Sequence, residues 1–226
     1  MPVVRTCPNA YSLEIMDEII PIFPLEVVVY PGDKLNLHIF EPRYQQLIND
    51  TVKTKQPFGI PAVVKGKLGG LGATVELRHV ANVQADGQMD IKTEGRRVFR
   101  VVSWLKNYPG KLYSGAVVEY PVFDEIGDAA LMRKIVADVK QLHRLLKVKK
   151  KLSKPNSKLT SYDVAHHVGL NLEQEYALLG LFFETERQKY LHRYLKNALP
   201  IVMNMEALKE KIQLNGHFKN LPGFEI

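Results

Sequence analysis

Histidine and cysteine side chains can bind a metal ion, and a cysteine thiolate can also act as a nucleophile. The seven histidines form no His-Glu-x-x-His pattern, and the adjacent His166 and His167 would point to different sides of a helix. The single cysteine, Cys7, has no base near it in the sequence, and one cysteine forms neither an internal disulfide nor a multi-cysteine zinc site. We therefore expect no metal, no cofactor and no thiol chemistry.

Serine and glycine motifs of catalysis are also missing. No serine lies in a Gly-x-Ser-x-Gly pattern, which positions the nucleophile of many hydrolases. The one glycine-rich segment, KGKLGGLG at 65–72, lacks Gly-Lys-Ser/Thr and leads into a strand pattern, so that no helix N-terminus would face a phosphate. We expect this segment to be a mobile hairpin tip. No constellation supports a hydrolase, and we expect no hydrolysis of ATP or peptides by this chain.

The positive charge of the chain is concentrated in one segment. The net charge is +7, and eight of the 31 basic residues lie at 140–158, where no acidic residue occurs. Without that segment the chain is close to neutral, with 23 basic and 24 acidic residues. Lys149, Lys150 and Lys151 are the candidate contacts for an anion. Because no aromatic residues for base stacking are interleaved with them, a solvated helix end and linker is the favoured interpretation, and RNA binding is the alternative.

Up to about residue 120 the patterns are those of strands. The segment 35–39 alternates apolar and polar residues, which is typical of a half-buried strand. Pro42 predicts a helix start, with a helix over 42–53 and with Glu41 and Arg43 as an ion pair at its beginning. Further strands are expected at 27–30, 58–64, 73–83, 89–102 and 113–120, with a turn at Asp86-Gly87 and a bulge at Gly95. Short strands joined by turns predict a closed or nearly closed β-barrel.

Beyond residue 121 the apolar period changes from 2 to 3.6 residues, which indicates helices. Four helices are expected, with the N-caps Asp128, Thr160, Asn171 and Thr185. The first should end at the lysines 149–151, whose charges suit a helix C-terminus. Pro200 lies inside the last apolar stripe, so we expect a kink there.

The beginning of the chain carries no membrane or secretion signal. Residues 1–18 lack the continuous apolar core of a signal peptide, so a flexible tail is expected, with Met16 as an alternative start of translation. No window approaches the roughly 20 apolar residues of a membrane span. Together with the lone cysteine, this predicts a cytoplasmic protein that makes no membrane contact.

Several motifs resemble those of one protein family. PIFPL at 21–25, YPG at 30–32 and LHIFEPRY at 37–44 resemble the opening of the Lon protease amino-terminal (substrate-binding) domain, which also occurs in a stand-alone form. The resemblance covers about 19–195 and includes Gly95-Arg96 with Phe99, and more loosely Glu186-Arg187. It implies an α+β fold, with a PUA-like β pseudobarrel at 19–123 followed by a C-terminal helical bundle at 124–226. Full-length Lon proteases also carry an ATPase and a Ser-Lys peptidase domain, whose motifs do not occur here.

The resemblance implies a non-catalytic protein that recognises polypeptide segments or a partner protein, in connection with protein quality control. An RNA-binding PUA-like protein that uses 140–158 is the alternative. Apolar and aromatic residues that flank turns or the glycine-rich segment are the candidate contacts for unfolded polypeptide: Phe23, Phe40, Tyr44, Phe58 and Leu71. Core packing explains the four aromatic residues equally well, whereas an apolar residue at a glycine-rich tip has no obvious core to fill.

Overall fold

The computed structural model describes residues 18–152, 154–155 and 158–218, so the expected tail and the alternative start at Met16 lie outside the described residues. The chain divides into two compact units, Met1–Phe123 with Leu170–Phe182 and Asp124–Gly169 with Phe183–Ile226. We call them the barrel unit and the helical unit. The sequence analysis placed the barrel at 19–123 and the helical bundle at 124–226. The segment Leu170–Phe182 differs, because it packs with the barrel although it follows the first two helices of the helical unit.

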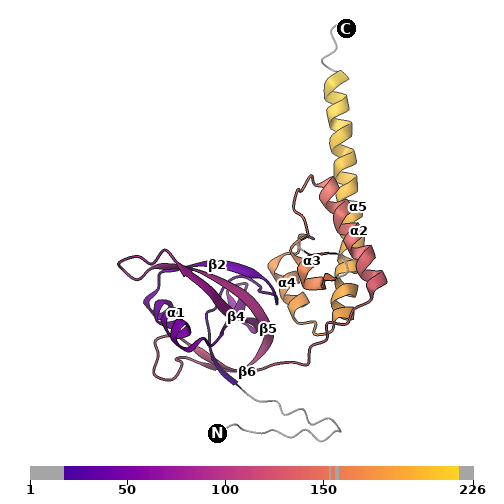
Figure 1. Cartoon of the computed structure of the whole chain (residues 1–226). Coiled ribbons are helices and arrows are strands. Elements are labelled where there is room, and N and C mark those ends of the chain that lie inside the picture. The colour runs from indigo at the N-terminus through magenta and orange to yellow at the C-terminus, as the bar shows by residue number, and fades with distance from the viewer. Residues whose placement is uncertain (1–17, 153, 156–157, 219–226) are drawn as a thin grey trace, which may run out of the picture. The chain divides into compact units, whose positions relative to one another are not determined.

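The barrel unit is built on one antiparallel sheet (Figure 1). Its six strands are β1 (Glu18–Pro21), β2 (Lys34–Ile39), β3 (Phe58–Val64), β4 (Lys67–Ala81), β5 (Met89–Leu105) and β6 (Gly115–Glu119). The order is β1-β6-β5-β4-β3, and β2 pairs with β5 outside this path. Two parallel bridges, Ile22 with Gly59 and Leu25 with Ala62, join the chain after β1 to β3 and close the sheet. The predicted α+β fold with a β pseudobarrel is therefore confirmed.

The long strand β5 organises the barrel, because it pairs with three other strands. Its first part pairs with β2, its last part pairs with β6, and β4 pairs with it along the opposite edge. The register of the β4–β5 pair shifts beside Gly95, which confirms the predicted bulge. A Cβ atom on Gly95 would lie 2.2 Å from the carbonyl oxygen of Tyr30. Glycine is therefore needed where the chain after β1 crosses β5.

The strand predicted at 27–30 does not form. Val28, Val29 and Tyr30 are almost completely buried, but this stretch is irregular and pairs with no strand. The Tyr30 N–H donates to the Asp33 carboxylate at 2.8 Å instead of to a strand neighbour. The β-branched residues thus fill the core without joining the sheet.

Helix α1 (Pro42–Thr54) begins at the predicted proline, and it covers part of the barrel. Its buried residues Tyr44, Leu47 and Ile48 belong to the same core cluster as Phe58. At the other end of the helix, the Tyr113 hydroxyl donates to the Asp50 carboxylate at 2.9 Å. The barrel core is therefore completed by the helix.

Helix α4 (Leu172–Leu179) completes the barrel unit. The Tyr30 hydroxyl donates to the Glu175 carbonyl at 3.0 Å, and the Leu71 N–H donates to the Tyr176 hydroxyl at 3.1 Å. The expectation that 65–72 forms one hairpin tip is wrong, because the turn comprises only the two residues between β3 and β4. Leu71 lies within β4, where it pairs with Arg100.

The helical unit consists of α2 (Ala129–Leu145), α3 (Ser161–Ala165) and α5 (Glu184–Phe218). The Asp128 carboxylate accepts from the N–H groups of Ala130 and Leu131, and Thr160 forms a capping box with Asp163, as predicted. Helix α2 ends earlier than the lysines at 149–151, and α5 begins one residue before the expected cap. Helix α5 continues through Pro200.

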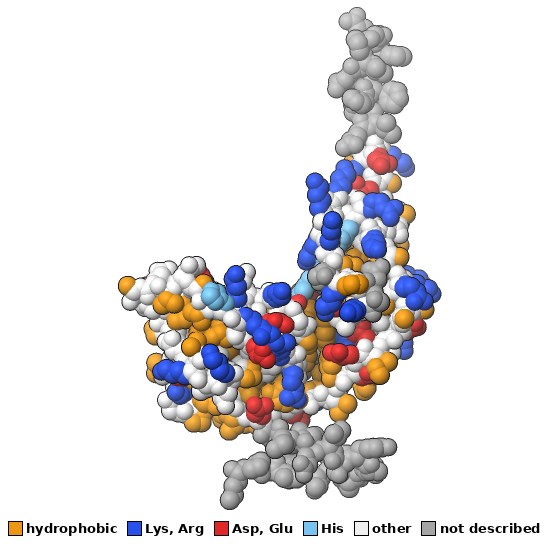
Figure 2. All heavy atoms as spheres, viewed as in Figure 1, with side chains coloured by type: hydrophobic (Ala, Val, Ile, Leu, Met, Phe, Trp, Pro, Cys, Tyr) orange, Lys and Arg blue, Asp and Glu red, His pale blue; other side chains and the backbone are white. Residues whose placement is uncertain are grey.

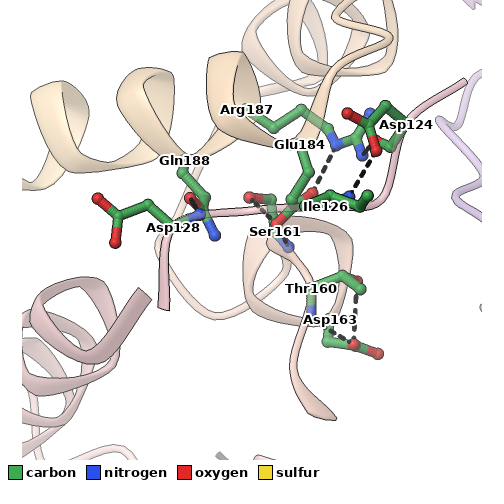
Figure 3. Close-up of polar contacts among 9 residues, drawn as sticks. All are labelled: Asp124, Ile126, Asp128, Thr160, Ser161, Asp163, Glu184, Arg187 and Gln188. Carbon is green, nitrogen blue, oxygen red and sulfur yellow. Dashed lines mark hydrogen bonds and ion pairs between the residues drawn. The ribbon is translucent and has the colours of Figure 1, made fainter. Parts of the chain in front are cut away.

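A buried polar network joins the segments of the helical unit (Figure 3). The Arg187 side chain is completely buried, and it donates to Glu184 Oε2 at 2.8 Å and to the Asp124 carbonyl at 2.9 Å. The other carboxylate oxygen of Glu184 accepts from the N–H and the hydroxyl of Ser161. The Arg187 guanidinium also lies 4.6 Å from the ring centroid of Tyr162. One ion pair thus holds α3, α5 and the chain that leads into α2.

Candidate functional site

A pocket of about 480 Å³ opens on the barrel unit. Its size falls in the range of roughly 300 to 1,000 Å³ that is usual for ligand sites. It is lined by the chain after β1, the second half of β2, the start of α1 and one residue before β6: Phe23, Pro24, Leu25, Leu37, His38, Ile39, Phe40, Glu41, Arg43, Tyr44 and Ser114. Three of the five residues proposed from the sequence, Phe23, Phe40 and Tyr44, therefore line one pocket.

The three aromatic residues differ in exposure. Phe23 and Tyr44 are buried, with ring centroids 4.1 Å apart, and they form the inner wall of the pocket. Phe40 is 60% exposed. Exposed large apolar side chains occur elsewhere on the chain as well, and Phe40 differs from most of them in lying beside an apolar pocket, an arrangement that is common at binding sites. Phe40 is thus the aromatic residue of this pocket that core packing does not explain.

Phe58 and Leu71 do not line this pocket. Phe58 is completely buried, and its ring lies behind that of Phe23, with centroids 6.5 Å apart. Leu71 is half-buried, and a Cβ atom on Gly180, just after α4, would lie 3.2 Å from its Cδ1 atom. Leu71 therefore has a packing partner, which the sequence did not reveal.

The rim of the pocket carries charges. Arg43 pairs with Glu41 at 2.7 Å, the ion pair expected at the helix start, and its guanidinium lies 4.6 Å from the ring centroid of Tyr44. His38, which the sequence analysis did not single out, has Nδ1 at 2.8 Å from Asp90 Oδ1 and Nε2 at 3.1 Å from Gln88 Oε1. Both partners accept hydrogen bonds here, so they favour the protonated ring.

The hydrogen bond to Asp90 and that to Gln88 raise the pKa of His38 above its usual value of 6.5. Conversely, hydrogen bonds from Asn82 and His38 lower the pKa of Asp90. Because the pKa of His38 is raised in the folded protein, its stabilising contribution is complete below pH 6.5 and is lost as the pH rises through the raised value. Protonation of His38 therefore adds a positive charge at the rim that is paired with the Asp90 carboxylate.

We predict that the Asp90→Asn substitution lowers the pKa of His38, because it removes the charged acceptor of the Nδ1–H group. The measurement is an NMR titration of the imidazole protons in both proteins. Histidine His79, which lies in β4 and is exposed, serves as the internal control. An unchanged His38 titration would contradict the hydrogen bond to Asp90.

The strand β2 has one edge without a strand partner. The Gly95 N–H donates to the Asp33 carbonyl, and the Thr93 hydroxyl donates to the Leu35 carbonyl, so these carbonyls face β5. Backbone groups alternate in direction along a strand, so those of Lys34, Asn36 and His38 point away from β5. Within the described part of the chain, no strand pairs with that edge. It ends at the pocket, whose lining includes Leu37, His38 and Ile39.

The predicted anion contacts Lys149, Lys150 and Lys151 lie elsewhere, in the segment of the helical unit that follows α2. They are exposed and line a separate pocket of about 430 Å³. The structure therefore brings them together with one another, but not with the aromatic candidates.

The described residues contain neither a metal-binding cluster nor a helix that could span a membrane. No group of three or more His, Cys, Asp or Glu side chains there could hold a metal ion. Cys7 lies outside the described ranges. Among the helices that the structure describes, none is both long and apolar enough to cross a membrane.

Taken together, the fold and the pocket define a small α+β module, with a pseudobarrel, helices that follow it and an apolar cavity on the barrel. Residues 19–197 match the family model of the ATP-dependent protease La (LON) substrate-binding domain, and the chain belongs to this family. No curated protein matches the chain in sequence.

Solved structures with a similar fold include the following two. One is the Lon N-terminal domain protein from Xanthomonas campestris, with a TM-score of 0.59 and 24% identity over 78% of this chain and 98% of that chain. The other is the N-terminal domain of the Mycobacterium avium complex Lon protease, with a TM-score of 0.58 and 14% identity over 79% of this chain and 98% of that chain. At these identities the likeness establishes the fold alone.

Proposed function

We propose that the barrel unit binds extended polypeptide segments without catalysing a reaction on them, as a recognition module in protein quality control. The observation that carries this proposal is the exposed Phe40 beside an apolar pocket, at the end of the unpaired edge of β2. The family match, which covers a substrate-binding domain, supports a binding role. The proposed ligand is a protein segment with aromatic or aliphatic side chains.

Two physical contributions support this mode of binding. An added peptide strand can pair with the outward N–H and C=O groups of Lys34, Asn36 and His38, and these bonds do not depend on the peptide sequence. Alternate side chains of the peptide then point to the same side, where the pocket can accept one or two of them. A module that recognises many unfolded segments needs this combination of backbone pairing and loose apolar selection.

Most of the affinity should come from apolar contact, which contributes about 25 cal/mol per Å² buried. Peptide binding should therefore persist in about 0.5 M salt, where charge interactions are screened within a few ångströms. The RNA-binding alternative depends on the basic segment 140–158, which belongs to the helical unit and not to the barrel.

The test is the affinity of a fluorescent extended peptide for the whole chain, measured by anisotropy. We expect Phe40→Ser to weaken binding by about tenfold or more, the typical cost of truncating a central aromatic contact. The midpoint of thermal unfolding should change little, because Phe40 is 60% exposed. Leu112→Ser is the matched control, since Leu112 is 63% exposed on the barrel unit outside the pocket. Equal affinities of the Phe40 and Leu112 variants would refute the site.

Backbone methylation of the peptide tests the strand pairing separately. One peptide is methylated at the odd-numbered backbone nitrogens and the other at the even-numbered ones. In a paired strand, the N–H groups that remain point toward β2 in one of these peptides and away from β2 in the other. We expect the peptide whose remaining N–H groups point away from β2 to lose binding and the other peptide to retain it. Equal binding of both peptides would exclude pairing with the β2 edge. Whether the peptide contacts the pocket would still be decided by the Phe40→Ser variant.

A further inference from the structure

The helical unit carries a second pocket, of about 430 Å³, which has a different chemistry from the barrel pocket. Its lining contains no acidic residue. Helix α2 and the segment that follows it supply six basic side chains to this lining: Lys140, Arg144, Lys149, Lys150, Lys151 and Lys154. Val139, Val148 and Leu152 form its apolar part. In Figure 2, Lys and Arg side chains gather on the helical unit.

The basic segment is held against the helices and is not a free linker. His143 on α2 has Nδ1 at 3.1 Å from the Lys150 carbonyl and Nε2 at 2.9 Å from the His167 carbonyl. The Lys150 ammonium donates to the His166 carbonyl at 3.1 Å, and Lys154 pairs with Asp163 at 2.7 Å. The segment is thus tied to α2, to Asp163 in α3 and to the residues that follow α3, which gives the pocket a defined wall.

Most of the charge in this pocket is uncompensated. Among the described residues, Lys140, Arg144, Lys149 and Lys151 form no ion pair, whereas Lys154 has one with Asp163. Like charges that line one concave surface repel each other and concentrate a positive potential there. An anion of several charges would relieve this repulsion.

We propose that this pocket binds a compact multivalent phosphate anion, of the oligophosphate class. Each phosphoryl group brings up to about two negative charges and three acceptor oxygens, so a small molecule can contact several of the cations at once. An acidic peptide carries one charge per residue and extends by roughly 3.3–3.6 Å for each, so fewer of its charges fit in the pocket. Lysine ammonium groups bind phosphate as point charges that can adjust to the ligand.

Single-stranded nucleic acid fits this pocket less well. Such sites combine basic grooves with aromatic side chains on which the bases stack. The lining contains no phenylalanine, tyrosine or tryptophan. The ring of His143 is stacked on that of His167, with centroids 5.4 Å apart, and its nitrogens are used by the two carbonyls.

Titration calorimetry of the whole chain with inorganic tripolyphosphate, at about 0.1 M salt, tests this proposal. We expect saturable binding of one molecule per chain. The triple variant Arg144→Gln, Lys149→Gln, Lys151→Gln should bind about tenfold more weakly or worse, since the ligand loses three direct partners. The control is Lys55→Gln, Lys92→Gln, Lys106→Gln, which removes the same charge from exposed lysines of the barrel unit and should change the affinity less than about twofold.

Each other result would overturn the proposal. Undetectable binding of tripolyphosphate would mean that the pocket is not a phosphate site. Equal losses of affinity in the two triple variants would mean that the anion responds only to the overall positive charge of the chain. An octaglutamate peptide that binds as tightly as tripolyphosphate would assign the pocket to carboxylates. An oligonucleotide that binds tenfold more tightly than tripolyphosphate would make it a nucleic-acid surface. Circular dichroism of both variants checks that the helices remain folded, so that lost binding reports on the pocket.

Discussion

Replacement of Arg187 by alanine should lower the free energy of unfolding by about 3–5 kcal/mol, the range found when one partner of a buried ion pair is removed. Arg187 is completely buried and Glu184 is 2% exposed. Without the guanidinium, the Glu184 carboxylate keeps only the two hydrogen bonds from Ser161, and the Asp124 carbonyl loses a donor. The measurement is urea unfolding followed by circular dichroism.

Arg193→Ala provides the matched control for this prediction. Arg193 lies on the same helix and is exposed, so its loss should change the free energy of unfolding by no more than about 0.5 kcal/mol. Similar midpoints for the two variants would mean that the Arg187–Glu184 pair contributes little to the stability of the helical unit.

The Gly95→Ala substitution should destabilise the protein by about 3 kcal/mol or more, because an overpacked site that is closed by backbone cannot relax cheaply. The new Cβ atom would lie 2.2 Å from the Tyr30 carbonyl oxygen and 3.1 Å from Cγ1 of Val29. Tyr30 has little freedom to move away, since its hydroxyl is bonded to the Glu175 carbonyl on α4. To relieve the clash, either the Tyr30 backbone must move away from β5 or the hydrogen bond from Tyr30 to Glu175 must break.

Gly70→Ala tests whether the effect comes from the close approach or simply from the loss of glycine in a strand. Gly70 lies in β4, and a Cβ atom there meets nothing within 4 Å. This variant should be neutral or stabilised by up to about 1 kcal/mol, because alanine reduces the freedom of the unfolded chain. Thermal unfolding of both variants gives the comparison, and comparable losses would rule out the steric explanation.

Local signals in the sequence predicted most elements of the fold correctly. The alternation at 35–39, the proline at the start of α1 and the capping residues Asp128 and Thr160 each act within a few residues. The stretch 27–30 was predicted as a strand because its residues are β-branched and aromatic. That composition indicates a buried environment, whereas the presence of a neighbouring strand depends on the whole fold.

The site could be predicted only in part, for the same reason. Phe40 and Tyr44 lie in one motif, 37–44, so their proximity follows from local geometry, whereas Phe23 comes from the separate motif 21–25 and joins them through the folding of the chain between. Leu71 was interpreted as a tip residue, because its partner Tyr176 is 105 residues away in the sequence. Periodicity describes the face of a helix but does not identify the unit on which that helix packs.

The burial of charged residues is the other feature that the sequence did not predict. Glu184 and Arg187 have the spacing of an ordinary surface ion pair on a helix. This spacing does not show whether the pair faces solvent or the protein interior. Only the contacts of Arg187 with Asp124 and Tyr162, on separate segments, show that it is inside. Likewise, the lysines at 149–151 were assigned to a helix end, whereas Lys150 contacts His143 on α2 and the His166 carbonyl after α3.

The return of α4 to the barrel unit has a consequence for the order of events during translation. The strands are complete once residue 123 has been made, yet the helix that bonds Tyr30 and Leu71 is contained in Leu170–Phe182. The ribosome must add the 59 residues 124–182 before α4 can pack on the barrel, which takes roughly 3–12 s at about 5–20 residues per second. During that interval the nascent barrel displays the surface that α4 will cover, and it is itself the kind of incompletely folded polypeptide that chaperones bind.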